Sequence, residues 1–342
     1  MWSTGNWQIL QRLGWAGALS GVMLMMTVTL GHAAGPGQGR TVQPVTTGRT
    51  DHWFQNFVVQ IGLERLGYKV KPYLEAQFPA MYLAVANGEA DYTAVGWEKL
   101  QAAFFDNAGG NVKMEHVGVL IRNVLQGYLI DKTTADKYHV TNLGQLASPT
   151  LARLFATSKN GKAHLTGCDP GWGCAPVIKH QLKAFGLENT VIQDQGSYFA
   201  LIANTIARFK AGKPILYYTW TPLWVSSVLR PGIDTVWLNV PFSSLPGDQK
   251  GVDTTLPDGR NLGFPPDNVR IVANRSWLEK NPAAKRFFQL VTIPLADVNR
   301  AILLEHNGQS SRSQIWQAAN EWVKAHKAQF DRWVAEAATA GQ

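Results

Sequence analysis

Residues 53–97, WFQNFVVQIGLERLGYKVKPYLEAQFPAMYLAVANGEADYTAVGW, decide the class of fold, because helical and extended patterns follow one another along them. Residues 53–66 place apolar side chains on one face of a helix, and residues 81–86 predict a second, shorter helix. Residues 68–71 and 92–95 predict strands on either side of that second helix. Strands separated by helices predict an α/β protein with a mainly parallel sheet that helices cover on both faces.

The same alternation continues further along the chain. A second unit is expected over residues 127–266, with helices over residues 176–185 and 197–210 and a strand over residues 214–219. Residues 313–337 predict one long amphipathic helix. The chain has 342 residues, a length that accommodates about two domains.

The composition is that of a globular protein. The chain is 45% hydrophobic and 16% charged, which excludes a disordered chain. Its formal net charge of +8 would suit nucleic acid only if the basic residues were gathered into a stripe. They are instead spread singly, as at Lys69, Arg208 and Lys213. We therefore predict a solvated basic surface and no nucleic-acid partner.

Residues 1–33 have the order of a secretory signal peptide. Arg12 is the only Lys, Arg, Asp or Glu before Arg40, an apolar run over residues 13–30 follows it, and small residues then lead to Ala33. The alternative is an uncleaved anchor, because the run is close to the minimum length that spans a bilayer. Glycines within the run weaken a span, so the sequence predicts cleavage near Ala33 and an exported protein.

The chain has only two cysteines, Cys168 and Cys174. In an exported protein such a pair predicts a disulfide. A metal site is the alternative, but the nearby His164 and His180 complete no tetrahedral set at a usual spacing, so no metal is predicted. A bridge that closes so short a loop stabilises by only about 2–2.5 kcal/mol. The loop is therefore expected to present Trp172 and the amides beside it.

Catalytic motifs are absent from the sequence. It contains no Gly-x-Ser-x-Gly elbow, no phosphate-binding loop and no His-Glu-x-x-His helix. Residues 158–164 are faintly similar to a calcium loop, but Lys159 and Lys162 bring the wrong charge and the carboxylates are missing. The sequence thus favours a binding protein over an enzyme, and it predicts no cofactor.

Three tryptophans stand where an open α/β sheet binds its ligands. Trp97 and Trp220 are expected at the carboxyl ends of strands, and Trp172 on the cystine loop. Indole faces hold quaternary ammonium groups by cation–π attraction. Gly173 and Cys174 offer free amides at the start of a predicted helix, which suit an anion. A cage for a methylated cation beside amides for a carboxylate is a betaine pocket.

The sequence resembles the periplasmic glycine betaine/proline betaine-binding proteins of bacterial ProU-type ABC importers, which are substrate-binding proteins of the OpuAC type. The resemblance covers essentially the whole chain after the signal segment. The segments that carry it are Tyr92-Thr93-Ala94-Val95-Gly96-Trp97, Gly127-Tyr128-Leu129-Ile130-Asp131, Gly167-Cys168-Asp169-Pro170-Gly171-Trp172-Gly173-Cys174 and Tyr217-Tyr218-Thr219-Trp220-Thr221-Pro222.

The resemblance implies a fold and a set of ligand contacts. The implied fold is the type II periplasmic binding protein fold, in which each of two lobes has a mainly parallel sheet covered by helices. Lobe one would take residues 34–125 and 268–342, lobe two would take residues 126–267, and the ligand would lie in the cleft between them. The family's three box tryptophans match Trp97, Trp172 and Trp220, and the amides on its ligand's carboxylate match those of Gly173 and Cys174.

The sequence departs from the family at Gln101. The family places a carboxylate-binding histidine four residues after the first box tryptophan, and this chain has Gln101 there. One interpretation keeps the function, because an amide still donates a hydrogen bond to a carboxylate. The other is a changed preference, for example toward choline or carnitine.

The resemblance implies a periplasmic receptor that captures glycine betaine or proline betaine for osmoprotection. The receptor would deliver its ligand to permease subunits in the inner membrane. A receptor for another quaternary amine is the first alternative. An exported enzyme that acts on quaternary amines is the second.

Overall fold

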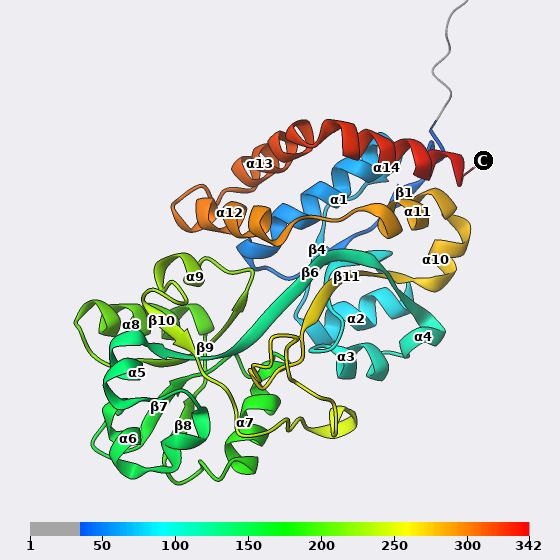
Figure 1. The fold of residues 1–342 in the computed structure, drawn as a ribbon. Helices are drawn as coiled ribbons and strands as arrows, with labels where there is room; N and C mark the ends of the chain where they lie inside the picture. Colours follow the sequence, from blue (N-terminus) through cyan, green and yellow to red (C-terminus); the bar gives the residue numbers. More distant parts are fainter. Residues whose placement is uncertain (1–34, 342) are drawn as a thin grey trace, which may run out of the picture. The chain divides into compact units, whose positions relative to one another are not determined.

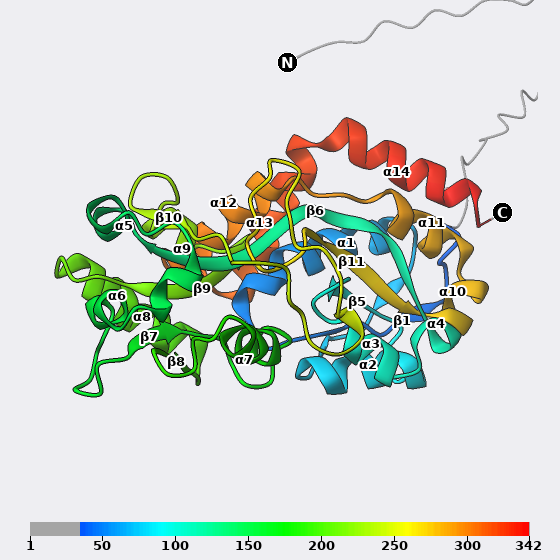
Figure 2. The same ribbon diagram turned by 60° about the horizontal axis from the view of Figure 1, so that its bottom comes forward.

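The computed structural model describes residues 35–341, so the predicted signal peptide over residues 1–33 lies outside the described residues. Figure 1 shows the ribbon of this part of the chain, and Figure 2 shows the same ribbon turned by 60°. Within residues 35–341, no single helix is long and apolar enough to cross a bilayer, and the one pair of helices that reaches that length is bent by 92°.

Strands and helices alternate along most of the described chain. The strands are β1 (Thr41–Val42), β2 (Val45–Thr46), β3 (Lys69–Val70), β4 (Leu74–Glu75), β5 (Tyr92–Trp97), β6 (Met114–Asp131), β7 (Ala163–Thr166), β8 (Val191–Asp194), β9 (Leu216–Thr221), β10 (Thr235–Trp237) and β11 (Asp267–Asn274). The α-helices are α1 (Trp53–Arg65), α2 (Phe78–Asn87), α3 (Ala102–Asn107), α4 (Gly110–Lys113), α5 (Lys132–Tyr138), α6 (Pro149–Leu154), α7 (Cys174–Ala184), α8 (Tyr198–Lys210), α9 (Val225–Val228), α10 (Arg275–Lys280), α11 (Pro282–Leu290), α12 (Leu295–His306), α13 (Arg312–Ala325) and α14 (Lys327–Thr339). Short 3-10 helices lie at Thr50–His52 (η1), Leu143–Ala147 (η2) and Gly247–Gln249 (η3).

The 18-residue strand β6 joins the two ends of the main sheet. Its residues 114–124 pair with β11, and residues 125–131 pair with β9 and β10. The sheet runs in the order β5-β11-β6-β9-β7-β8, with β10 beside β6. Figure 1 shows β6 running from α4, past β11, toward α5.

The expectation of a mainly parallel sheet is wrong for the middle of this sheet. β11 pairs antiparallel with both β5 and β6, and β6 pairs antiparallel with β9 and β10. Parallel pairing occurs where β7 meets β8 and β9, and in the two small sheets β1-β3 and β2-β4. A crossover helix favours parallel pairing between strands that follow one another, as α7 does for β7 and β8. The antiparallel pairs β5-β11, β6-β11 and β6-β9 each join strands that have other strands between them in the chain, so no single crossover sets their direction.

Helices cover the sheet on both faces in Figures 1 and 2. The helices α1 and α11–α14 lie on one face of β6 and β11, and α2–α4 lie on the other. The fully buried side chains include Phe54 on α1, Tyr92 on β5 and Phe287 on α11. The α/β class predicted from residues 53–97 is therefore confirmed.

The predicted long helix over residues 313–337 is two helices. α13 ends at Ala325, α14 begins at Lys327, and His326 lies between them. The ring nitrogen Nδ1 of His326 lies 2.9 Å from the carbonyl oxygen of Trp322, one turn earlier, where a hydrogen bond holds the chain at the break. Both helices keep the predicted apolar face, because Ile315, Trp322, Phe330 and Trp333 are buried.

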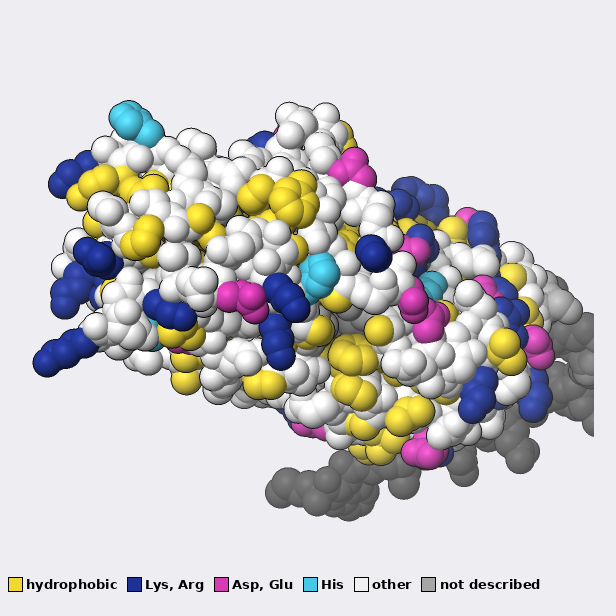
Figure 3. Space-filling view, turned by 90° about the horizontal axis from the view of Figure 1, so that it is seen from below, with side chains coloured by type: hydrophobic (Ala, Val, Ile, Leu, Met, Phe, Trp, Pro, Cys, Tyr) yellow, Lys and Arg dark blue, Asp and Glu magenta, His cyan; other side chains and the backbone are white. Residues whose placement is uncertain are grey.

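Basic side chains are dispersed over the face of the molecule in Figure 3, as the sequence predicts. Figure 3 shows Lys and Arg side chains in several separate groups on the face it displays, with Asp, Glu and apolar side chains between them. No continuous basic stripe crosses that face. Over residues 35–341, no cluster of three His, Cys, Asp or Glu side chains is arranged to hold a metal ion.

Candidate ligand-binding site

All six residues predicted to contact a ligand line one pocket. They are Trp97, Gln101, Trp172, Gly173, Cys174 and Trp220. The pocket is built by segments that are distant in sequence, namely the end of β5 and the turn after it, the cystine loop with the start of α7, and the end of β9. Folding thus brings these three segments, which are far apart in the sequence, to one pocket.

The tryptophans form a buried aromatic wall. Trp97, Trp172 and Trp220 are 8%, 9% and 6% exposed. The rings of Trp172 and Trp220 meet edge to face, with 5.5 Å between centroids and 82° between planes. Tyr198 on α8 supports this pair, with its ring 4.7 Å from that of Trp220. Trp97 reaches the same pocket from the end of β5.

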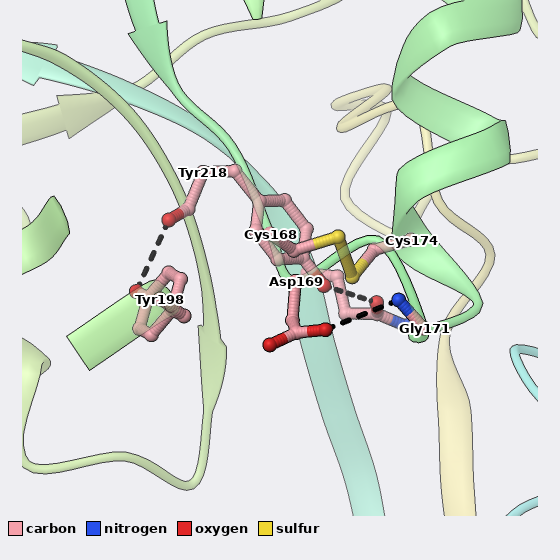
Figure 4. The surroundings of a disulfide bond; sticks show 7 residues. Cys168, Asp169, Gly171, Cys174, Tyr198 and Tyr218 are labelled. Atoms are coloured by element: carbon pink, nitrogen blue, oxygen red, sulfur yellow. Dashed lines mark hydrogen bonds between the residues drawn. A yellow bond between two sulfur atoms is a disulfide. The ribbon is translucent and has the colours of Figure 1, made fainter. Parts of the chain in front are cut away.

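The cystine loop is tied down by a disulfide and by its own hydrogen bonds. The predicted bridge between Cys168 and Cys174 is present, and the two Cα atoms are 6.3 Å apart. A side-chain oxygen of Asp169 accepts a hydrogen bond from the amide of Gly171 at 3.1 Å (Figure 4). The backbone carbonyl of Asp169 accepts one from the amide of Trp172 at 3.0 Å. These bonds hold the backbone that carries Trp172 into the pocket.

The amides of Gly173 and Cys174 stand at the N-terminus of α7. The first amides of a helix have no partner within it, and the helix dipole places partial positive charge there. A carbon added at Gly173 would lie 2.5 Å from the carbonyl oxygen of Leu100, so only glycine permits this approach of the cystine loop to the turn after β5. The two walls of the pocket therefore meet at Gly173.

The side chain of Gln101 is held in one orientation. Its oxygen Oε1 accepts hydrogen bonds from the Tyr82 hydroxyl at 2.8 Å and from the Trp97 backbone amide at 3.1 Å. A backbone amide can only donate, so a flipped Gln101 amide would lose that bond. The oxygen is thus occupied by protein donors, and the NH₂ group of this pocket-lining residue keeps its capacity to donate.

Asp267 at the start of β11 positions the turn that carries Gln101. Its carboxylate accepts hydrogen bonds from the amides of Lys99 at 3.0 Å and Leu100 at 2.9 Å. Burial raises the pKa of Asp267, although these backbone donors favour its charged form. Asp267, on the strand β11 that pairs with β5, therefore fixes the turn after β5. No motif in the sequence indicates Asp267.

Six further residues line the pocket that the sequence did not point to. They are Arg49, His52, Phe78, Leu100, Gln126 and Tyr218. Burial lowers the pKa of His52 to about 3, so the ring is neutral at physiological pH. Gln126 and Tyr218 are joined by a hydrogen bond of 2.7 Å from the phenol to the amide oxygen. Arg49 and His52 lie in a short segment before α1 that carries no motif.

Reduction of the disulfide is expected to impair ligand binding more than folding. The bridge closes a short loop, whose stabilising effect is about 2–2.5 kcal/mol, but that loop presents Trp172 and two amides to the pocket. Order lost from a binding loop appears as affinity lost. Melting and titration curves with and without reductant measure the two effects. An unchanged affinity in the reduced protein would show that the bridge only stabilises the fold.

The chain is similar along most of its length to proteins of one family. The OpuAC family model, the substrate-binding domain of ABC-type glycine betaine transport systems, matches residues 40–325. The chain is 52% identical over 307 residues to the glycine betaine-binding periplasmic protein OusX of Dickeya dadantii, covering 90% of this chain and 92% of the relative. It is 50% identical over 305 residues to the glycine betaine/proline betaine-binding periplasmic protein of Escherichia coli K12, covering 89% of this chain and 92% of the relative.

A solved structure shares the fold at low sequence identity. The lactococcal OpuAC in its closed conformation with glycine betaine superposes with a TM-score of 0.64 at 18% identity, over 86% of this chain and 99% of that chain. The two-lobe periplasmic binding protein fold expected from the sequence is thereby confirmed. With a family model over most of its length and relatives at about half identity, the chain belongs to the OpuAC family of substrate-binding domains of ABC-type glycine betaine transport systems.

Proposed function

We propose that this protein captures glycine betaine or proline betaine in the pocket of Trp97, Trp172 and Trp220 and delivers it to an ABC permease. As a member of a family of substrate-binding domains, the chain is a binding protein and not an enzyme. The observation that carries the proposal is the meeting of three buried indoles with free helix-start amides in one pocket. The relatives are named as periplasmic, and the predicted signal peptide supports the same compartment.

The cationic end of the ligand is assigned to the indoles. A trimethylammonium group donates no conventional hydrogen bond, so shape and cation–π attraction must hold it. Trp172 and Trp220 stand nearly perpendicular, and Trp97 approaches from β5. Burial strengthens this attraction because little water competes for the cation.

The carboxylate end is assigned to amide donors. The residues that carry these donors, Gly173, Cys174 and Gln101, line the same pocket as the indoles. The N-terminus of α7 adds its dipole to these donors. A ligand with one methylated cation and one carboxylate satisfies both ends.

The lobe boundaries are part of the proposal. Lobe one would comprise residues 34–125 and 268–342, and lobe two residues 126–267, with the chain crossing near the middle of β6 and at the start of β11. The close approach of Gly173 to Leu100 supports a cleft that closes over the ligand. The closed form would then be what the permease subunits recognise.

The test is calorimetry against glycine betaine, proline betaine, carnitine and choline. Betaines are expected to bind at least about ten-fold tighter than choline, because a buried donor without a partner costs about 1–3 kcal/mol. Recovery of unchanged ligand separates a receptor from an enzyme. Choline binding as tight as betaine binding would favour a receptor for another quaternary amine, and binding of neither would refute the proposal.

The substitution Gln101→His is expected to make betaine affinity depend on pH. Glutamine does not titrate, so the affinity of the unaltered protein stays nearly flat between about pH 5.5 and 8. A histidine there, with an ordinary pKa of about 6.5, gains a proton at the lower end of this range and attracts the carboxylate. Titrations of both proteins over this range measure the change. A flat profile for Gln101→His would mean that position 101 does not contact the carboxylate.

A further inference from the structure

The aromatic pocket already contains a positively charged group, the guanidinium of Arg49. The guanidinium carbon of Arg49 is 4.4 Å from the ring centroid of Trp172 and 5.0 Å from that of Trp220. It also lies 5.4 Å from the ring of Phe199 on α8. Distances under about 6 Å are those of cation–π contacts. The guanidinium of Arg49 thus contacts the same two indole rings, Trp172 and Trp220, that are proposed to bind the ligand's ammonium group.

The remaining space shows that Arg49 and a ligand exclude each other. The free volume of the pocket is about 30 Å³, enough for about one or two water molecules. A betaine is several times larger than a water molecule. The ligand therefore fits between Trp172 and Trp220 only after the guanidinium has moved away.

The Arg49 side chain is desolvated and bound to Asp51. Nε of Arg49 donates to the Asp51 carboxylate at 2.9 Å, and a terminal nitrogen makes a second contact with the same carboxylate. The two side chains are 14% and 7% exposed. Burial alone would raise the pKa of Asp51, but the charge of Arg49 holds it below the ordinary value. The pair is therefore ionised and largely out of water.

A second cavity adjoins this pair and contains a buried carboxyl group without a partner. The cavity has a volume of about 310 Å³, and its walls include Thr50, Asp51, Phe199 and Glu305. Glu305 on α12 is 7% exposed, and neither of its oxygens has a hydrogen-bond partner among the described residues. Asp51 and Phe199, which Arg49 contacts now, also border this cavity.

We propose that Arg49 is an internal occupant of the aromatic box, which the ligand's ammonium group displaces, and that Glu305 receives its guanidinium in the adjacent cavity. The proposal rests on the proposed function, because it assumes that the ligand's cation binds between Trp172 and Trp220. Asp51 pairs with Arg49 and also borders the adjacent cavity. The guanidinium therefore keeps its ion pair with Asp51 while it exchanges the two indoles for Glu305, whose carboxyl group gives up its proton as the cation arrives. The ligand must then compete with Arg49, which lowers affinity and discriminates against weak cations.

The first experiment compares Arg49→Ala with Arg312→Ala. Arg312 is the matched control, since its guanidinium carbon lies 4.0 Å from the ring centroid of Trp53 and it is paired with Glu75, outside the pocket. Affinities for glycine betaine and for tetramethylammonium are measured by calorimetry. Removing the internal competitor is expected to tighten both by about ten-fold, while Arg312→Ala leaves both unchanged.

The second experiment adds Glu305→Gln alone and together with Arg49→Ala. In the presence of Arg49, Glu305→Gln is expected to weaken betaine binding several-fold, because a glutamine amide cannot ionise to pair with the displaced guanidinium. In the Arg49→Ala protein the same substitution is expected to change nothing. An equal loss in both proteins would show that Glu305 does not receive Arg49.

The outcomes separate this inference from the proposed function. If the unaltered protein binds glycine betaine and Arg49→Ala binds it no better, Arg49 is not a competitor and the inference fails alone. Weaker betaine binding with unchanged tetramethylammonium binding would mean that Arg49 contacts the ligand's carboxylate instead. If the unaltered, folded protein binds no betaine, the proposed function itself fails. Melting curves for each variant establish that the compared proteins are folded.

Discussion

Alanine at any one of Trp97, Trp172 and Trp220 is expected to weaken betaine binding by about 1–2 kcal/mol or more, the range of a desolvated cation–π contact. All three rings are buried in one pocket, so each loss removes both an electrostatic contact and a wall of the cage. Phenylalanine keeps a ring face and is expected to recover part of the affinity. Calorimetry or the change in tryptophan fluorescence on binding measures the effect.

Trp322 and Trp333 are the matched controls for the box. They are also buried, at 8% exposure each, but they pack within α13 and α14. Trp322 donates from Nε1 to Asp297 at 3.0 Å, and Trp333 packs on Phe330. Alanine at either position is expected to lower the free energy of unfolding by about 3–5 kcal/mol and to leave the affinity of the folded protein intact. Equal affinities for all five alanine variants would refute the assignment of the box.

Glu305→Gln is expected to stabilise the protein increasingly as pH rises. Burial, with a further contribution from the charge of Asp51, raises the pKa of Glu305 from 4.5 to about 9. Between these values the folded protein keeps a proton that the unfolded chain has lost. The free energy of unfolding therefore falls by about 1.4 kcal/mol per pH unit through this one group, or about 4 kcal/mol between about pH 5 and pH 8. Glutamine, which cannot ionise, removes this loss.

The measurement is denaturant unfolding of both proteins at several pH values. The other titratable groups at this cavity, Asp51 and His306, and the Arg49 that pairs with Asp51 are present in both proteins, so the difference between the two curves isolates Glu305. Glu279→Gln, on an exposed position of α10, is the control and is expected to show no such trend. A constant difference between the Glu305→Gln protein and the unaltered protein from about pH 5 to 8 would contradict the raised pKa.

The sequence by itself determined the local parts of this protein. The apolar spacing of residues 53–66 predicted α1, and Cys168 and Cys174 predicted their disulfide, because helix periodicity and a short covalent loop depend only on neighbouring residues. It also placed Trp97 and Trp220 at the ends of strands, where a sheet brings side chains together. Those patterns, with the resemblance they revealed, were enough to predict one pocket.

Only the tertiary structure decided which distant groups meet. Strand direction in the middle of the sheet depends on how β6 and β11 pair, and those contacts join residues far apart in the chain. The cation at the rings of Trp172 and Trp220 comes from Arg49, and the unpaired carboxyl group in the adjacent cavity comes from Glu305. Neither residue lies in a motif. These two residues influence the pocket because folding buries their ionisable groups in adjoining cavities, in an interior of low dielectric constant where electrostatic interactions are strong.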